Sequence, residues 1–166
     1  MHALLLSALF IVNPTAEAPA PVIDDTVHVA ADDAETGTLV VNMVRFRNSN
    51  GQVLVSLYNK GDGFPTKPGR AYKGVKTKIT GRVAQYIFED LPPGEYAVSI
   101  AHDENNNGQL DTSWIGIPRE GIGASNNPKG RMGPPRFRDA KFNLSAGEKV
   151  TKSINLVYIY NNEGNI

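Results

Sequence analysis

Oxygen-bearing side chains recur at alternate positions in one short stretch of the chain, residues 102–111, whose sequence is HDENNNGQLD. Such side chains at the first, third and fifth positions of a loop wrap around a hard cation such as Ca²⁺, and a glycine at the sixth allows a sharp turn. Counted from Asp103, the ninth position is again an aspartate, which could bind the ion directly or through water. The predicted calcium ligands are Asp103, Asn105, Asn107, the backbone carbonyl of Gln109, and Asp111.

The loop lacks the last part of an EF-hand, because the twelfth position, a bidentate Glu in EF-hands, is Trp114 here. Two formal negative charges without a terminal Glu predict weak binding, with a Kd of roughly 0.1 to 1 mM. Glu120 or Asn126 could return from the following segment to complete the shell. The alternative is an ion-free turn, since Asn and Gly tolerate positive φ and Asn107-Gly108 is a strong turn signal.

Residue types that occur in active sites lie in the same region, but their spacing matches no recognisable catalytic motif. His102 is the only histidine after residue 28, which excludes a His-rich zinc site. We therefore expect no enzyme. The alternative is a small hydrolase with a loop-built site around His102, Asp103 and Glu120.

Our first functional hypothesis is a non-catalytic binding or accessory module that meets an anionic glycan, a lipid head group or an envelope protein. The alternative for Trp114 is a core plug beneath the long loop. A purely structural envelope module is a further alternative. The predicted contact residues are Trp114, Arg119, Glu120, Ser125, Asn126, Lys129 and Arg131.

The net charge of zero hides an asymmetry, because no Lys or Arg precedes Arg45. From Gly37 onward 17 basic residues face 11 acidic ones, a net charge of +6. The basic clusters lack the interleaved aromatic residues of a base-stacking surface, so we expect no nucleic acid partner. One cluster comprises Lys60, Lys67, Arg70, Lys73, Lys76, Lys78 and Arg82, and the other Lys129, Arg131, Arg136, Arg138 and Lys141.

The first 36 residues differ in character from the rest. An apolar run over residues 3–12, followed by small residues at cleavage spacing, predicts a signal peptide over residues 1–18. Residues 19–36 are acidic and poor in large apolar residues, which predicts a disordered linker. No run reaches the ~20 apolar residues that span a bilayer, and the chain has no cysteine for disulfides or thiol catalysis. We expect a periplasmic or secreted protein.

Residues 37–162 alternate apolar and polar positions between clusters of Gly, Pro and Asn, without sustained helical periodicity. This pattern predicts an all-β, immunoglobulin-like sandwich of about seven strands with long loops. We expect a hairpin from residues 38–47 and 52–58, strands over 77–80, 82–88 and 96–100, and an irregular segment over 116–135. Residues 138–144 and 150–160 are expected to form a final antiparallel pair. Tyr96, after Pro93-Gly94, is expected to be a corner residue between the sheets.

Several motifs stand along the predicted domain: GQVLVSLYN (51–59), LPPGEYAV (91–98), the loop at 102–111, GIPRE (116–120), GASNN (123–127), PPRF (134–137) and DAKF (139–142). Together they resemble the bacterial domain-of-unknown-function family 2141 over about residues 38–160. The resemblance implies a secreted or envelope-associated sandwich of the prealbumin-like kind, similar to carboxypeptidase regulatory and collagen-adhesin B-type domains, and it implies no reaction. The Tyr-Arg-Gly-Ser ending of transthyretin-like hydrolases is absent.

Overall fold

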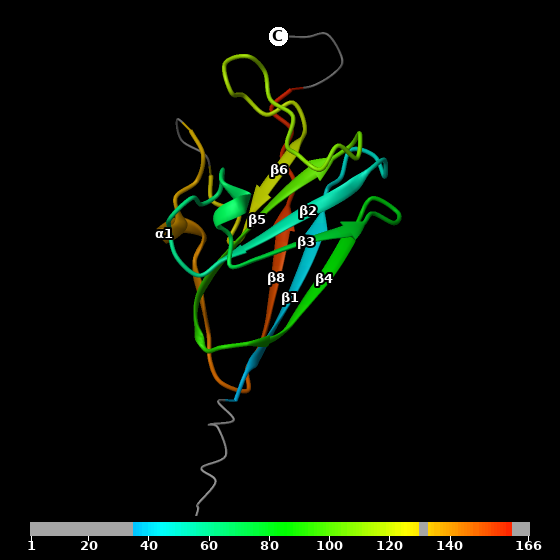
Figure 1. The fold of residues 1–166 in the computed structure, drawn as a ribbon. Helices are drawn as coiled ribbons and strands as arrows, with labels where there is room; N and C mark the ends of the chain where they lie inside the picture. Colours follow the sequence, from blue (N-terminus) through cyan, green and yellow to red (C-terminus); the bar gives the residue numbers. More distant parts are fainter. Residues whose placement is uncertain (1–34, 130–132, 161–166) are drawn as a thin grey trace, which may run out of the picture. The chain divides into compact units, whose positions relative to one another are not determined.

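The computed structural model describes residues 35–129 and 133–160 (Figure 1). The predicted signal peptide and nearly all of the predicted linker therefore lie outside the described residues. No helix within these ranges is long and apolar enough to cross a membrane. The elements are β1 (Gly37–Val44), β2 (Gln52–Tyr58), η1 (Pro68–Arg70), β3 (Lys73–Lys78), β4 (Ala84–Leu91), β5 (Gly94–Asp103), β6 (Gly121–Ala124), α1 (Phe137–Ala140), β7 (Phe142–Leu144) and β8 (Lys149–Asn155).

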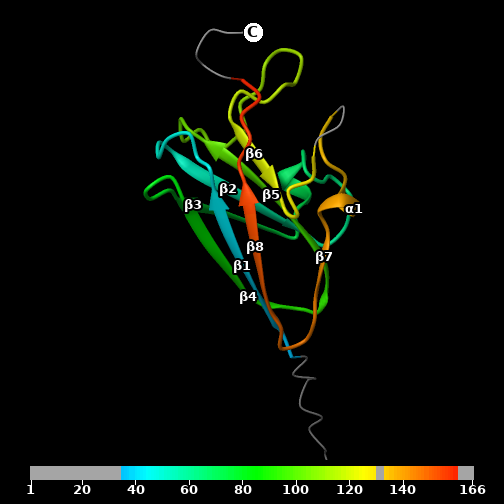
Figure 2. The same cartoon turned by 180° about the vertical axis from the view of Figure 1, so that it is seen from behind.

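Two sheets enclose one hydrophobic core, which confirms the predicted all-β sandwich. One sheet has the strand order β4-β1-β8 and the other β3-β2-β5-β6, with β7 paired to the beginning of β5 (Figures 1 and 2). Alternate residues of each strand point inward, as a pleated strand requires. The core cluster accordingly joins Leu39, Val41 and Met43 of β1 to Val53 and Leu57 of β2.

The predicted hairpin of residues 38–47 and 52–58 is wrong. β1 pairs with β4 and, in parallel, with β8, whereas β2 pairs with β3 and β5 in the other sheet. Residues 45–51 cross between the sheets, and the fully buried Phe46 anchors this crossing. Gly51 has φ +69°, and a Cβ there would overlap the Asp103 carbonyl oxygen. The glycine therefore serves a close backbone approach rather than a hairpin turn.

The predicted final antiparallel pair is also wrong. Residues 137–140 form α1, β7 pairs with β5, and β8 pairs with β1 in parallel. The turn at 145–148, in which the backbone N–H of Ser145 donates to Glu148, carries the chain from one sheet to the other. The segment 116–135, expected to be irregular, contains β6 at the edge of the second sheet.

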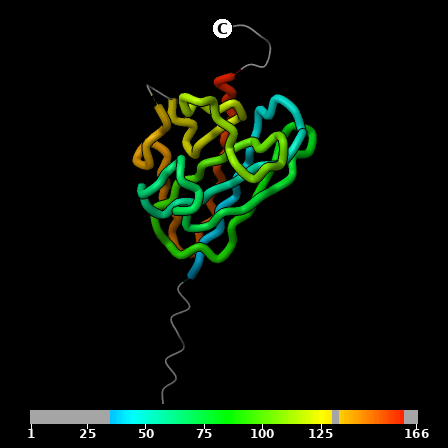
Figure 3. Tube along the Cα trace, turned by 45° about the horizontal axis from the view of Figure 1, so that its top comes forward, coloured from blue at the N-terminus to red at the C-terminus, as the bar shows by residue number. Residues whose placement is uncertain are grey.

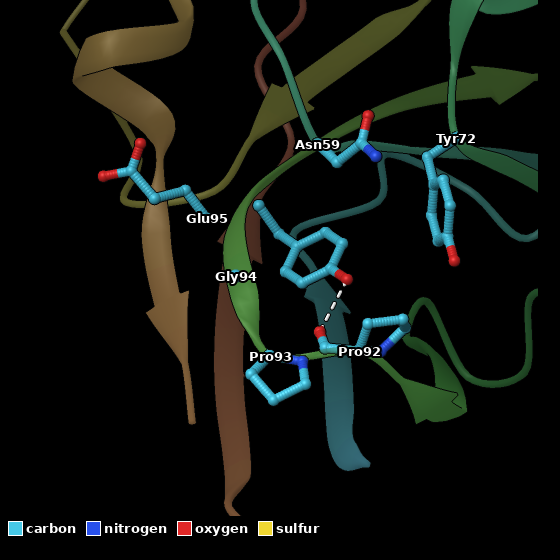
Figure 4. A pocket seen from close by; sticks show the side chains of 7 residues that line it. Asn59, Tyr72, Pro92, Pro93, Gly94 and Glu95 are labelled. Atoms are coloured by element: carbon cyan, nitrogen blue, oxygen red, sulfur yellow. Dashed lines mark hydrogen bonds between the residues drawn. The ribbon is translucent and has the colours of Figure 1, made fainter. Parts of the chain in front are cut away.

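The predicted corner role of Tyr96 is confirmed. Its hydroxyl donates a 2.7 Å hydrogen bond to the Pro92 carbonyl oxygen just before β5 begins, and its ring is almost fully buried (Figure 4). Burial raises the pKa of this phenol. The hydrogen bond fixes the start of β5, the ten-residue strand that ends in Asp103.

Four connecting segments gather at the other end of β5. We call this region the loop end, defined by residues 45–51, 79–83, 104–120 and 156–160. Strand register places it: Gln52 lies opposite both Lys78 and Asp103, and Val44 lies opposite Asn155. Figures 1 and 2 show these segments at one end of the sandwich, and Figure 3 tilts that end forward.

Candidate functional site

Asp103, the last residue of β5, is the centre of the loop. Its side chain is fully buried and both carboxylate oxygens accept hydrogen bonds. Oδ1 accepts the backbone N–H of Asn107 at 3.0 Å, and Oδ2 accepts the backbone N–H of Gly108 at 2.9 Å and the Gln52 side-chain amide at 2.7 Å. The loop is therefore wound tightly around one carboxylate.

The other predicted ligand side chains converge within the same loop. Oδ1 of Asn105 accepts the N–H of Asn107 at 3.0 Å, and Oδ1 of Asn107 accepts the N–H of Gln109 at 2.8 Å. The side-chain amide nitrogens of Asn105 and Asn107 donate to the two oxygens of Asp111, at 2.8 and 2.9 Å. Gln109 takes part through its backbone. The structure thus brings the four predicted ligand side chains together, and Gln109 joins them through its N–H rather than through the predicted carbonyl oxygen.

Glu120 returns to this loop from the following segment. It is buried, and its two carboxylate oxygens accept the backbone N–H groups of Glu104 and Asp111, at 2.8 and 2.9 Å. It therefore joins the beginning of the loop to its end. Asn126 lies elsewhere, because its side chain bonds the Lys141 carbonyl and the Lys152 ammonium.

Lys76, a member of the first basic cluster, lies beside the loop. A Cβ built at Gly108 would be 3.2 Å from the Nζ of Lys76. An ammonium group here opposes the binding of a second cation. Within residues 35–129 and 133–160, no three His, Asp or Glu side chains are grouped to hold a metal ion. A cation at this loop would therefore need amide and carbonyl oxygens in addition to the carboxylates.

His102 lies beneath the loop and is fully buried. Its Nδ1 is 2.7 Å from the Tyr158 hydroxyl and its Nε2 is 2.8 Å from the Asn50 carbonyl oxygen. Because a carbonyl only accepts, Nε2 carries a proton, whereas Nδ1 shares its hydrogen bond with the Tyr158 hydroxyl, which also accepts the Arg47 backbone N–H. Both imidazole nitrogens are thus occupied by structural hydrogen bonds.

An ion pair covers this histidine. Arg47 donates two hydrogen bonds to the Glu104 carboxylate, at 2.6 and 2.7 Å, and its guanidinium lies 4.7 Å from the centre of the Tyr158 ring. The hydrogen bond to Glu104 raises the Arg47 pKa, and burial raises the Tyr158 pKa. Sequence reasoning missed this cluster because Arg47 lies 57 residues from Glu104 and 111 residues from Tyr158 along the chain. No local spacing could have signalled it.

The GASNN motif joins separate elements. Ser125 is fully buried; its Oγ accepts the N–H of Val98 at 2.9 Å and donates to the Ala140 carbonyl at 2.6 Å. Asn127 bonds the carbonyl of Ser153 and the N–H of Asn155 in β8. Ser125 and Asn126 therefore lie apart from the loop end. Lys129 is exposed, and Arg131 lies outside the described residues.

Residues 111–119 form a projection that we call the projecting turn. Backbone hydrogen bonds join Arg119 to Asp111, Ser113 to Ile117 and Gly116 to Ser113, at 2.8 to 2.9 Å. Trp114 lies at its tip with 94% of its surface exposed, so the alternative of a core plug is wrong. Arg119 is exposed at its base. The indole, the guanidinium and the predicted ion loop therefore share one end of the sandwich.

One comparison with known proteins gives a match. No curated protein and no solved structure matches the chain. One family model matches residues 41–152, from the middle of β1 into β8, and its description is "uncharacterized protein conserved in bacteria (DUF2141)". The matched range includes the predicted ion loop, the projecting turn and the GASNN motif. The chain therefore belongs to this family of uncharacterised conserved bacterial proteins.

Proposed function

We propose that the protein is a non-catalytic binding module of the cell envelope, in which residues 103–111 bind Ca²⁺ weakly and stiffen the loop end. The convergence of Asp103, Asn105, Asn107 and Asp111 is the observation that carries this proposal. A turn alone needs two residues of suitable conformation, whereas four oxygen-bearing side chains meet here.

The hydrogen bonds within the loop leave oxygen lone pairs free to bind a cation. Each Asn Oδ1 that accepts one backbone N–H keeps a second lone pair, and the Asp111 carboxylate is held only by two neutral amides and is partly exposed. A cation that replaces those amide contacts would gain a charged ligand. The nearby Lys76 and the presence of only two carboxylates keep the expected affinity in the weak extracellular range.

Calcium would act on the projecting turn through Asp111. The backbone carbonyl of this residue accepts the Arg119 N–H, and its N–H donates to Glu120. A ligand that holds the Asp111 side chain therefore also holds the base of the turn. An external location is supported by the apolar run at residues 3–12 and suits a millimolar calcium site.

The proposal that the module is not catalytic is supported by the burial of the candidate catalytic residues. His102 and Asp103 are fully buried and Glu120 nearly so, and the polar atoms of all three are engaged by backbone or structural side-chain partners. A general base must reach the proton that it removes. These three residues serve the architecture of the loop end.

The test is thermal unfolding of the full chain in about 1 mM calcium and in chelator. A Kd of roughly 0.1 to 1 mM corresponds to ~0.4 to ~1.4 kcal/mol of stabilisation, a rise in Tm of up to a few degrees. Asp111→Asn should abolish the rise, whereas the matched control Asp62→Asn, which changes an exposed carboxylate paired with Arg70, should retain it. Equal Tm values for the wild type in both buffers would reduce the loop to an ion-free turn.

A further inference from the structure

We propose that the projecting turn docks on an anionic lipid surface and inserts Trp114 and Ile115 into its interfacial layer. This inference deepens the proposed binding function by naming the class of partner. It does not require the calcium ion, because the turn is built by hydrogen bonds within the protein.

The apolar side chains at the tip are exposed on a rigid support. Trp114 is 94% exposed and Ile115 is 56% exposed. The turn beneath them is closed by three backbone hydrogen bonds and by a 3.1 Å bond from the Ile117 N–H to the Ser113 Oγ. A rigid turn presents the two side chains without the entropy cost of ordering a flexible loop. Indole rings favour the boundary between acyl chains and water.

Further apolar side chains lie at the same end. Val157, Ile159 and Tyr160 are exposed, and the pairing of Val157 with Ile122 of β6 places their segment at the loop end. Figures 1 and 2 both show this last described segment at the end where residues 111–119 project. Exposed apolar groups gathered at one end of a domain mark an interaction surface rather than ordinary surface composition.

The charges around the tip select an anionic partner. Of the acidic residues at the loop end, Glu104 is paired with Arg47, Glu120 is buried beneath two backbone amides, and Asp111 is partly buried. The exposed basic residues at this end and on the adjoining end of β3 have no such partners among the ion pairs of the described residues. Basic residues next to an interfacial surface draw a protein to anionic head groups. The basic residues are Arg45, Lys76, Lys78, Arg82 and Arg119.

The shape of the region favours a broad surface over a small ligand. One hollow of about 260 Å³ lies beside Tyr96 (Figure 4), and a second is lined by β1, β4 and the segment from Lys78 to Val83. Trp114 itself is nearly fully exposed and lines neither. A small glycan needs a hollow that covers much of its surface, whereas a projecting tip can enter a lipid interface.

Trp114 is the only tryptophan of the chain, so its fluorescence reports on the tip alone. The experiment mixes the full chain, in calcium-free buffer, with vesicles of phosphatidylglycerol and phosphatidylcholine. We expect a blue shift of the Trp114 emission and quenching by lipids with brominated acyl chains. Adsorption through the apolar run at residues 3–12 would leave this emission unchanged. An unchanged emission with the anionic vesicles overturns the proposal.

Two matched pairs of variants complete the test, with vesicle co-sedimentation as the readout. Ile115→Ser should weaken binding on the order of tenfold, whereas Ile87→Ser, on β4 and 42% exposed, should not. Arg119→Gln should weaken binding, whereas Lys149→Gln, at the opposite end of the sheet, should leave it intact. Equal losses within either pair would overturn the proposal.

The same experiment detects whether the tip instead contacts a second copy of the chain. A Trp114 emission that shifts with protein concentration in the absence of lipid would assign the tip to self-association and overturn lipid docking. Failure of the calcium proposal appears separately, as equal Tm values in a measurement that contains no lipid.

Discussion

Glu120 is a single residue on which the geometry of the loop end depends. Its two carboxylate oxygens accept N–H groups from Glu104 and Asp111, and it is buried. In Glu120→Gln, one acceptor becomes an amide N–H₂ that faces a backbone donor. We expect this change to lower the free energy of unfolding by about 1–3 kcal/mol, as for other buried groups left without partners. Urea denaturation measures the loss.

Glu95→Gln is the matched control for this prediction. Glu95 is also a glutamate, but it lies at the surface. Its side chain is about half exposed and forms an ion pair with Lys141. Exposed ion pairs contribute ~0–1 kcal/mol. Similar losses for the two variants would show that Glu120 has no special role in the loop end.

The individual residues also show what sequence can and cannot reveal about a site. The alternation of oxygen-bearing side chains from Asp103 to Asp111 is local. Sequence spacing was therefore enough to predict that these side chains lie close together. The alternative of a catalytic His102 needs an accessible imidazole, but the burial of this ring depends on Tyr158 and Asn50, which are distant along the chain. Burial, which distinguishes a base from a structural histidine, is a tertiary property.

At the scale of elements, β8 has an edge that one side chain protects. Asn127 donates to the Ser153 carbonyl and accepts the Asn155 N–H at 2.7 Å, so its amide replaces a neighbouring strand. We expect Asn127→Gly, which suits its φ of 46°, to leave the fold intact and to speed hydrogen exchange at the Asn155 amide. Unchanged protection at Asn155 would contradict this role. The Leu156 amide, bonded to Val44, is the internal control and should stay protected.

Periodicity predicted most strands but not their partners. Alternation in residues 38–44 and 52–58 is the same whether these strands pair with each other or belong to different sheets. The choice depends on Phe46 and Gly51, whose buried and close-packed positions carry the chain across the sandwich. β6 is only four residues long and includes two glycines, so its strand pattern was too short to identify.

For the whole molecule, three tyrosines predict how stability depends on pH. Burial raises the pKa of Tyr58, Tyr96 and Tyr158 in the folded state. The unfolded chain then loses these protons first, at about pH 10. The free energy of unfolding should therefore be fully retained below that pH and fall as the pH rises toward the folded-state values. Urea denaturation between about pH 8 and 11 measures this slope.

Tyr96→Phe separates the titration from the hydrogen bond. The variant loses the bond to Pro92 at every pH, but it also removes one of the three titrating groups. Its stability should be lower at about pH 8 and fall less steeply up to about pH 11 than that of the wild type. A slope as steep as that of the wild type would show that Tyr96 does not contribute.

The parallel pairing of β1 with β8 has a mechanical consequence. Seven register pairs, from Thr38–Lys149 to Val44–Asn155, join the two strands along their length. Tension applied between residue 37 at one end and residue 155 at the other pulls the strands along their axes in opposite directions. The rungs of the ladder are then loaded together in shear, rather than peeled apart one at a time. A domain held at its amino-terminal end and pulled from the loop end would accordingly yield only at high force.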